Sequence, residues 1–441
     1  MMRIAWIELR RSNARLVGLL IVVLTGVALL TDVHYWDTQW TRLANYHASA
    51  VFVLLPIALA GGAMLGRRER RTRADELLGS TGRPRWQRIT PAMAAMAVAV
   101  VLAHLFVFAA GGVLVARMTD YTSVRSMIVP VADSVILVGG AWLGFAAGRS
   151  WTSPLLPPAL AATGLLGQLG LSLAEAPGQM SRLDNLILVP QPPIYDWETV
   201  TGRAILGHLA LGAGLATAGF LLAAARRWPA RIVAVPVVVG AILAAALIPG
   251  VGQAGRYRVD HAAQRLVCSG RVCVTAVHQT SLTTIVPQAG RALTLLAKLP
   301  GAPTKAVEWR AATVYIPGEA DPSAVPVGPG TIAFTLDQET GQPGRHLVED
   351  LVWGAGAPQE RCEHADEVGL AAAGAWLLGT DTITTDDLVP EATFDTQVRD
   401  TVQALRRAPA AEQTRRVTAL RDAATACKPG LTSILTGKDH G

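Results

Sequence analysis

The chain has 441 residues, of which 51% are hydrophobic and only 16% are charged, and its mean hydropathy is +0.34. A soluble domain usually carries about 25% charged residues, so this composition excludes an ordinary soluble enzyme and indicates a membrane protein. The formal net charge is +6. Much of this charge comes from arginines between apolar segments, so it does not indicate nucleic-acid binding.

The apolar residues collect in blocks long enough to cross a hydrocarbon core of roughly 30 Å, for which about 20 helical residues are needed. These blocks cover residues 15–31, 48–66, 92–116, 126–148, 154–174, 203–225 and 231–250. The sequence therefore predicts a polytopic α-helical membrane protein with about seven transmembrane helices. The first block could be a signal peptide, but its apolar run exceeds the usual length of about 7–15 residues and no small-residue cleavage site follows. An uncleaved first span is the better interpretation.

The basic residues of the short loops predict the orientation, because Lys and Arg near a span stay on the cytoplasmic side. The basic residues lie at the N-terminus, after the second and fourth blocks, and between the sixth and seventh. They are Arg3, Arg10, Arg11, Arg15, Arg67, Arg68, Arg70, Arg71, Arg73, Arg83, Arg85, Arg88, Arg149, Arg226, Arg227 and Arg231. The intervening loops hold aromatic residues suited to a membrane interface, namely Tyr35, Trp36, Trp40 and Tyr46. We expect a multi-pass protein of the plasma membrane with a cytoplasmic N-terminus.

Seven spans would place residues 251–441 outside the membrane. This region predicts a mixed α/β extracytoplasmic domain that is large enough for its own core. A helical face is expected in SLTTIVPQAGRALTLLAKL, and further helices at 361–378 and 395–426. The stretches AVEWRAATVYI and TIAFTLD predict short strands.

All four cysteines lie in this C-terminal region, at Cys268, Cys273, Cys362 and Cys427. An oxidising exterior allows two disulfides with three possible pairings, of which Cys268 with Cys273 and Cys362 with Cys427 is the simplest. Four reduced, partly buried thiols are the alternative.

Residues 66–90, GRRERRTRADELLGSTGRPRWQRIT, form an arginine-rich loop with a helical centre between the second and third spans. Asp75 and Glu76 would lie early in this helix, where acids are favoured, and Gly79 and Gly82 provide its end. An acidic residue, ELL, a Ser-Thr pair and a later basic residue, directly after a second span, resemble the coupling helix of the membrane subunits of ABC exporters. The positions that match ATPase docking are Asp75, Glu76, Leu77, Leu78, Ser80, Thr81 and Arg85.

The N-terminal stretch IAWIELRRSNARL is similar to the amphipathic elbow helix that precedes the first span in that family. The resemblance implies residues 1–14 as a cytoplasmic elbow helix, 15–250 as a transmembrane domain with its coupling loop at 67–90, and 251–441 as an additional extracytoplasmic domain. It implies the membrane subunit of an ATP-driven exporter, with a separate ABC ATPase subunit, the lipid bilayer and a homodimer or heterodimer of membrane subunits as partners.

The chain has no GxxxxGK[ST] phosphate loop, so we expect ATP hydrolysis on the separate subunit and no enzyme activity in this chain. No cofactor or metal is expected either. His364 and Glu367 have a spacing compatible with metal binding, but HExxH and HxxEH are missing. Two alternatives to transport stay open, namely a membrane-anchored extracytoplasmic binding or sensor domain and a degenerate membrane-bound peptidase-like protein. The loop arginines would then only fix topology and contact anionic lipid.

Four polar residues fall inside the predicted spans, at His104, Asp133, Gln168 and His208. A central Asp costs about 2.5–3.5 kcal/mol in lipid, so these side chains should face the bundle interior or water. They could form a substrate path or a proton relay, and interhelical hydrogen bonds are the alternative. In the fourth span, GxxxGxxxG at residues 140–148 predicts close helix packing.

Overall fold

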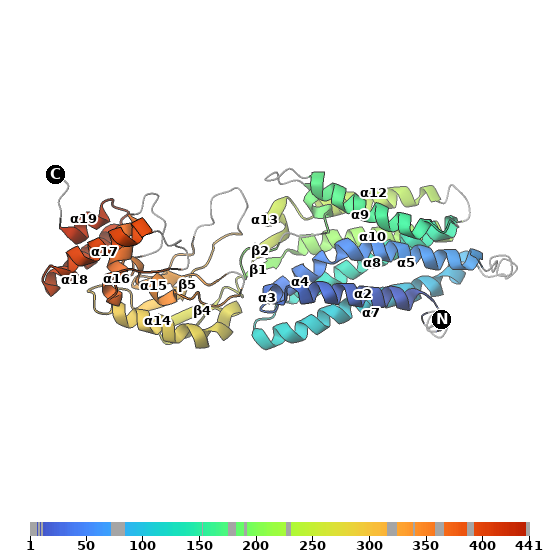
Figure 1. Cartoon of the computed structure of the whole chain (residues 1–441). Coiled ribbons are helices and arrows are strands. Elements are labelled where there is room, and N and C mark those ends of the chain that lie inside the picture. The colour runs from blue at the N-terminus through green and yellow to red at the C-terminus, as the bar shows by residue number, and fades with distance from the viewer. Residues whose placement is uncertain are drawn as a thin grey trace. The chain divides into compact units, whose positions relative to one another are not determined.

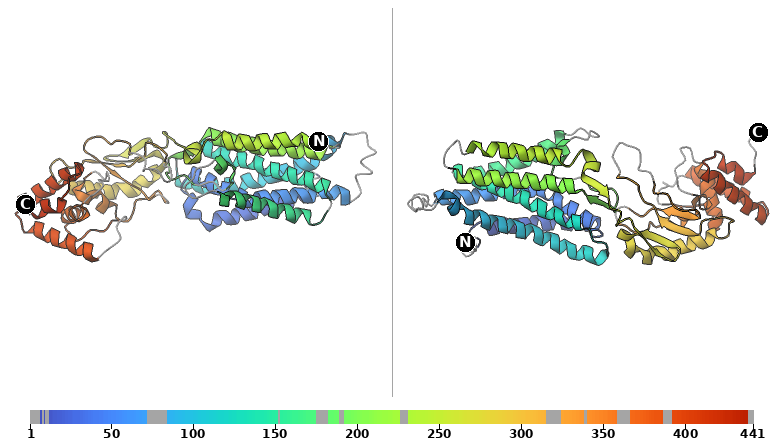
Figure 2. Two further views of the ribbon diagram at one scale, coloured as in Figure 1. Left: turned by 90° about the horizontal axis from the view of Figure 1, so that it is seen from above. Right: turned by 180° about the vertical axis from the view of Figure 1, so that it is seen from behind.

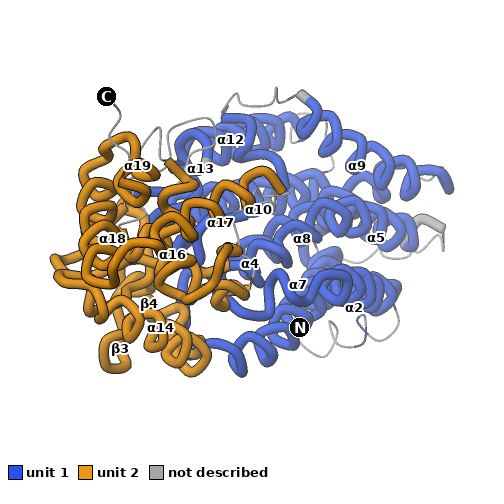
Figure 3. The backbone as a smooth tube through the Cα atoms, turned by 60° about the vertical axis from the view of Figure 1, so that its left-hand side comes forward, with its two compact units in different colours: residues 1–260, 313–322 blue, residues 261–312, 323–441 orange. Residues whose placement is uncertain are grey.

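The computed structural model describes residues 7, 9, 12–71, 84–151, 153–174, 182–188, 192–225, 231–314, 324–337, 340–357, 366–385 and 392–437. The chain divides into two compact units (Figure 3). Unit 1 comprises residues 1–260 and 313–322, and unit 2 comprises residues 261–312 and 323–441. The main boundary falls at His261, and strand β2 (Tyr257–Val259) pairs with strand β1 (Glu198–Val200) inside unit 1.

Unit 1 is a bundle of long helices (Figure 1). Among the described residues, six helices are long and apolar enough to cross a membrane by length and composition. They are α2 (Ala14–Thr31), α5 (Val51–Arg71), α7 (Arg85–Met118), α8 (Val124–Ser150), α9 (Leu156–Ala174) and α10 (Gly202–Ala224). Each coincides with one of the predicted blocks, which confirms a largely helical chain with about six candidate spans.

The seventh predicted span is a shorter helix than expected. Helix α12 (Ala234–Leu247) has 14 residues, so at 1.5 Å per residue it is about 21 Å long, against a hydrocarbon core of roughly 30 Å. It packs along α10 and leads through α13 (Gly252–Arg256) to β2. Because β1 precedes α10 and β2 follows α12, their antiparallel pairing returns the chain to the end of the bundle where α10 begins.

Helix α8 lies at the centre of the bundle, against α5, α7 and α10, as the view from behind also shows (Figure 2). Glycines allow its backbone to approach that of α5. A Cβ atom added at Gly144 would overlap the carbonyl oxygen of Leu59, and one at Gly148 would overlap that of Ala63. The GxxxGxxxG segment therefore packs two helices of one chain together, as its spacing predicts.

Residues 33–49 are largely helical and pack against the bundle. They fold as the short helix α3 (Val33–Trp36) and as α4 (Trp40–Ser49), which packs against α7 and α8. Trp36 is only 1% exposed and its indole Nε1 donates a hydrogen bond to the Leu29 carbonyl oxygen at 2.9 Å. Trp36 belongs to a buried core that includes Leu43.

Unit 2 contains the predicted mixed α/β structure. Its sheet has the order β3-β4-β5-β6, with β3 antiparallel to β4 and the other neighbours parallel. The strands are β3 (Leu266–Ser269), β4 (Val272–Thr275), β5 (Lys305–Glu308) and β6 (Thr331–Phe334). Helix α14 (Leu282–Leu296) connects β4 to β5 and buries Ile285, Leu293 and Leu296 against the sheet core, as its periodicity predicts.

The remaining elements of unit 2 are helical. They are η2 (Ala276–Ser281), α15 (Leu347–Val352), η3 (Trp353–Ala355), α16 (Glu367–Leu378), α17 (Ala392–Arg406), α18 (Ala410–Thr425) and α19 (Leu431–Thr436). The single helix predicted at 395–426 is two helices, because Pro409 cannot continue a helix but starts α18 well. The helix predicted at 361–378 is α16. Asp366 caps its N-terminus, because the side chain accepts a hydrogen bond from Gly369 N at 3.0 Å.

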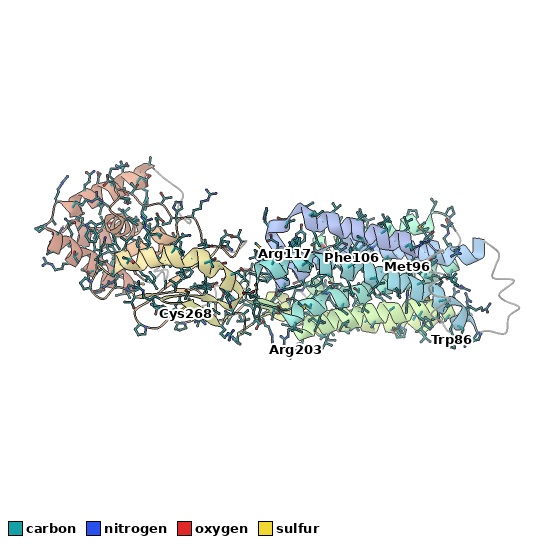
Figure 4. All side chains as sticks on the ribbon, turned by 90° about the horizontal axis from the view of Figure 1, so that it is seen from below. Trp86, Met96, Phe106, Arg117, Arg203 and Cys268 are labelled. Carbon is teal, nitrogen blue, oxygen red and sulfur yellow. A yellow bond between two sulfur atoms is a disulfide. The ribbon has the colours of Figure 1, made fainter. Side chains whose placement is uncertain are left out.

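A disulfide joins Cys268 on β3 to Cys273 on β4, which face each other in the hairpin (Figure 4). This is the first of the two predicted disulfides. Cys427 is also disulfide-bonded, whereas its predicted partner Cys362 lies outside the described residues.

Candidate functional site

Asp133 on α8 and His208 on α10 face each other in the interior of unit 1. The Asp133 Oδ1 atom lies 3.3 Å from the His208 Nδ1 atom. Their side chains are 2% and 15% exposed, respectively. Gly212 allows this approach, because its Cα packs against the α8 backbone at Ile136 and leaves no room for a Cβ atom. The small residues of the two helices thus bring two costly polar side chains into contact.

Two further histidines, His47 and His104, belong to the same region of unit 1. His47 on α4 and His104 on α7 are both 0% exposed, and their ring centroids are 4.1 Å apart. The His47 Nε2 atom lies 3.2 Å from the His104 carbonyl oxygen, and Phe108 packs edge-on against the His47 ring. Asp133 interacts electrostatically with His47. We call His47, His104, Asp133 and His208 the histidine–aspartate cluster.

Several polar atoms of this cluster have no partner. Within the described part of the chain, no hydrogen bond reaches either ring nitrogen of His104, the Nδ1 atom of His47 or the Oδ2 atom of Asp133. Roughly 90% or more of buried polar groups in proteins are hydrogen-bonded, so each exception asks for an explanation. Packing alone gives no reason to place three imidazoles and a carboxylate here.

A cavity adjoins the cluster and has a volume of about 30 Å³ for water-sized molecules. A buried water needs roughly 10–15 Å³ by this measure, so the cavity has room for about two. It is lined by Asn45, Ala48, Val129, Ala132, Val200, Ala204, Ile205, His208, Arg256 and Tyr257. The Tyr257 hydroxyl donates a hydrogen bond to Asn45 Oδ1 at 2.7 Å. His208 therefore contacts both the cavity and Asp133.

Two tyrosines at this end of the bundle are held in the protonated form. Burial raises the pKa of the Tyr257 phenol above its usual value. Burial, together with a 2.6 Å hydrogen bond to Asp260 Oδ2, raises the pKa of Tyr121 in the α7–α8 connection.

Helix α4 is held in place by a buried ion pair. Arg42 lies beside Asp196, with Nη2 and Oδ1 2.6 Å apart and both side chains 5% exposed. The Arg42 guanidinium also lies over the Tyr35 ring, 5.5 Å from its centroid. The pair is electrically neutral, so we assign it to positioning the helix that carries His47 rather than to binding.

The four polar residues predicted inside the spans do not stay together. His104, Asp133 and His208 meet in the cluster, whereas Gln168 on α9 lies apart and accepts a hydrogen bond from Leu188 N at 3.2 Å. His47 was not predicted, because it precedes the second apolar block by one position. A histidine directly before a span is the signal that could have suggested it.

Most of the predicted ATPase-docking positions cannot be placed. Asp75, Glu76, Leu77, Leu78, Ser80 and Thr81 lie outside the described residues. Arg85 is described, and it begins α7. Its Nη1 atom donates a hydrogen bond to the carbonyl oxygen of Ala225 at the end of α10, at 3.3 Å.

A buried polar network of unit 2 lies at the carboxyl ends of β4 and β5. Glu308 accepts hydrogen bonds from the backbone N of Thr275 at 2.6 Å and from its hydroxyl at 2.9 Å. The other oxygen of Glu308 lies 2.7 Å from His278 Nδ1. Both oxygens of this carboxylate are satisfied, so the network stabilises the sheet edge. The sequence patterns did not predict it.

Among the described residues, no group of three or more His, Cys, Asp or Glu side chains is arranged to hold a metal ion. Comparison of the chain with protein-family models, curated proteins and solved structures gives no match.

Proposed function

We propose that the chain is the membrane-spanning subunit of an ATP-driven, ABC-type exporter, and that a separate ATP-hydrolysing subunit docks on the loop at residues 67–90. The proposal rests on the DELLGST pattern of that loop and on its position after the second of six candidate spans. It includes a second membrane subunit, which is another copy of this chain or a different one.

Contacts of both flanks of the loop with other helices support the proposal. On the α5 side, Arg67 Nη1 donates a long hydrogen bond of 3.5 Å to the Pro154 carbonyl oxygen, just before α9. On the α7 side, Arg85 binds the end of α10. A displacement of the loop by a docked subunit would thus reach α9 and α10 as well as the two helices that it joins.

The charge distribution supports a cytoplasmic position of this loop. Arg67, Arg68, Arg85 and Arg88 lie at the end of the bundle where α5 ends and α7 begins. Trp86 marks that end in Figure 4, and Arg117 and Arg203 mark the opposite one. A concentration of basic residues beside the spans is typical of the cytoplasmic side.

The test is purification of the full chain from its native membrane, followed by measurement of ATP hydrolysis in the eluate. We expect ATPase activity with the wild type and its loss when Leu77→Asp and Leu78→Asp are combined, at an unchanged amount of membrane protein. Leu155→Asp is the matched control, because Leu155 is 72% exposed in the connection to α9 at the same end. Equal activity in all three samples would contradict docking on this loop.

A membrane-anchored extracytoplasmic binding domain is the second candidate, and one observation favours it. Unit 2 has a hydrophobic core of its own, formed by residues such as Val274, Leu293, Phe334 and Val402. A domain with its own core can bind a ligand without any change in the spans. On this second candidate, the purified chain would carry no ATPase activity.

A further inference from the structure

We propose that the histidine–aspartate cluster is a proton-binding site inside unit 1, and that it exchanges protons with water in the adjoining cavity. The inference concerns proton binding by this chain alone. It therefore stands independently of any docked ATPase.

The negative charge of the buried Asp133 carboxylate needs a positive charge beside it. Asp133 is 1% exposed, and a carboxylate removed from water is costly unless a positive charge pairs with it. Within the described residues, the only ion-pair partner of Asp133 is His208, an imidazole that is positive only when it carries a proton. The pair therefore becomes neutral by binding one proton.

Among the described residues, no permanently charged side chain of a neighbouring element forms an ion pair with Asp133. Helix α4 presents His47 and α7 presents His104. Helices α5 and α9 face α8 through apolar and small residues such as Leu55 and Leu59, and α9 has no titratable residue. Glu198 on β1, which packs against α8, is itself an acid, and Arg256 lines the cavity without forming an ion pair with Asp133. A proton is thus the charge that the interior can supply.

His208 connects the Asp133 carboxylate to water in the cavity. His208 is 15% exposed, contacts Asp133 through Nδ1 and also lines the cavity that has room for about two waters. A hydronium ion in the cavity can give its proton to neutral His208 and leave a water molecule behind. The imidazolium then pairs with the Asp133 carboxylate, so only an O–H bond breaks and an N–H bond forms.

The other two members of the cluster, His47 and His104, form a pair of imidazole rings. The ring centroids of His47 and His104 lie 4.1 Å apart with the ring planes tilted by 46°, and both side chains are fully buried. Three of their four ring nitrogens have no hydrogen-bond partner among the described residues. Asp133 Oδ2 is likewise without a partner. His47 interacts electrostatically with Asp133, and the His104 ring contacts the His47 ring, so we include both rings in the site.

The test uses the full chain in lipid nanodiscs with ¹⁵N-labelled histidine, observed by NMR at pH 7 and over a pH series. His208→Gln assigns the His208 signal among the nine histidines. We expect the wild-type signal to show protons on both ring nitrogens, Asp133→Asn to lose one of them and Asp133→Glu to keep both. Asp120→Asn is the control, because Asp120 is exposed in the α7–α8 connection and should leave the signal unchanged.

A wild-type His208 with a single ring proton would overturn the proposal, and this measurement requires no change at Asp133. An unchanged His208 signal in a folded Asp133→Asn variant would overturn it as well. A signal that responds to added Na⁺ or Zn²⁺ at constant pH, but not to pH, would show that the site binds a metal cation instead of a proton.

Discussion

Asp133 and His208 are 75 positions apart in the chain, yet their Oδ1 and Nδ1 atoms lie 3.3 Å apart inside the bundle. The contact joins α8 to α10, and His208 also lines the cavity. We expect it to stabilise the bundle as well as to hold a proton.

Asp133→Asn and His208→Gln, separately and together, should be non-additive in the free energy of unfolding. Residues in direct contact typically show a coupling energy of roughly 0.5–3 kcal/mol. The measurement is reversible unfolding in mixed micelles. Asp133→Asn combined with Thr217→Ala is the control, because Thr217 is an exposed residue of α10 and the two changes should add. Additivity in both pairs would contradict a stabilising contact.

Helix packing gives a second prediction. Gly144→Ala places a Cβ atom onto the carbonyl oxygen of Leu59, and such overpacking typically costs about 1–3 kcal/mol. Gly167→Ala on α9 meets nothing within 4 Å, so it should be neutral or stabilise the helix by up to about 1 kcal/mol. Thermal unfolding of both variants in detergent separates the two cases. Equal effects would mean that the α5–α8 approach is looser than described.

The disulfide gives a third prediction. Cys268 and Cys273 are five positions apart, so in a chain-entropy view their bond should add about 2 kcal/mol to the free energy of unfolding. Cys268→Ser with Cys273→Ser should remove that amount, whereas Ser269→Ala on the same strand should not. Chemical denaturation of the full chain under non-reducing conditions measures it. A loss of stability confined to Ser269→Ala would contradict the assignment.

Stability should fall at alkaline pH in a way that depends on Tyr121. The folded chain raises the pKa of this phenol, whereas the unfolded chain releases the proton near pH 10. Above about pH 10, the unfolded state therefore binds fewer protons than the folded state, and stability decreases as the pH rises. Tyr121→Phe should flatten this decrease in a pH series of thermal unfolding. Parallel curves for the variant and the wild type would contradict it.

The sequence predicted the candidate spans well, because a helix that crosses lipid has to be apolar over a length set by the membrane. It also predicted α14, whose buried residues Ile285, Leu293 and Leu296 repeat with the helical period. Local patterns were sufficient in both cases, because the signal is the length of one apolar run or the spacing of apolar residues within one helix.

The buried residues of α4 could not be predicted in the same way. Arg42 finds its partner Asp196 at a distance of 154 positions in the chain, and His47 meets His104 only after α4 has packed against α7. Such pairs depend on tertiary contacts, which leave no period in the sequence. The pairing of β1 with β2, which keeps residues 257–259 in unit 1, depends on tertiary contacts in the same way.

The predicted topology can be tested by thiol labelling of intact cells. A membrane-impermeant maleimide should label Gln403→Cys, because Gln403 is exposed on α17 of unit 2 and unit 2 is expected outside. Ser80→Cys should be labelled only after the cells are permeabilised, since the 67–90 loop is expected inside. Labelling of both positions in intact cells would contradict this orientation.

The central claim is that the 67–90 loop contacts an ATP-hydrolysing subunit. The most direct test attaches a short thiol-directed photocrosslinker to Leu77→Cys in native membranes, with Leu183→Cys as the control. Leu183 is 47% exposed in η1 (Arg182–Leu186), which lies against the end of α12. We predict a cross-linked product that contains a nucleotide-binding subunit from position 77 and none from position 183. The absence of such a product from position 77, or its equal formation from both positions, would contradict the claim.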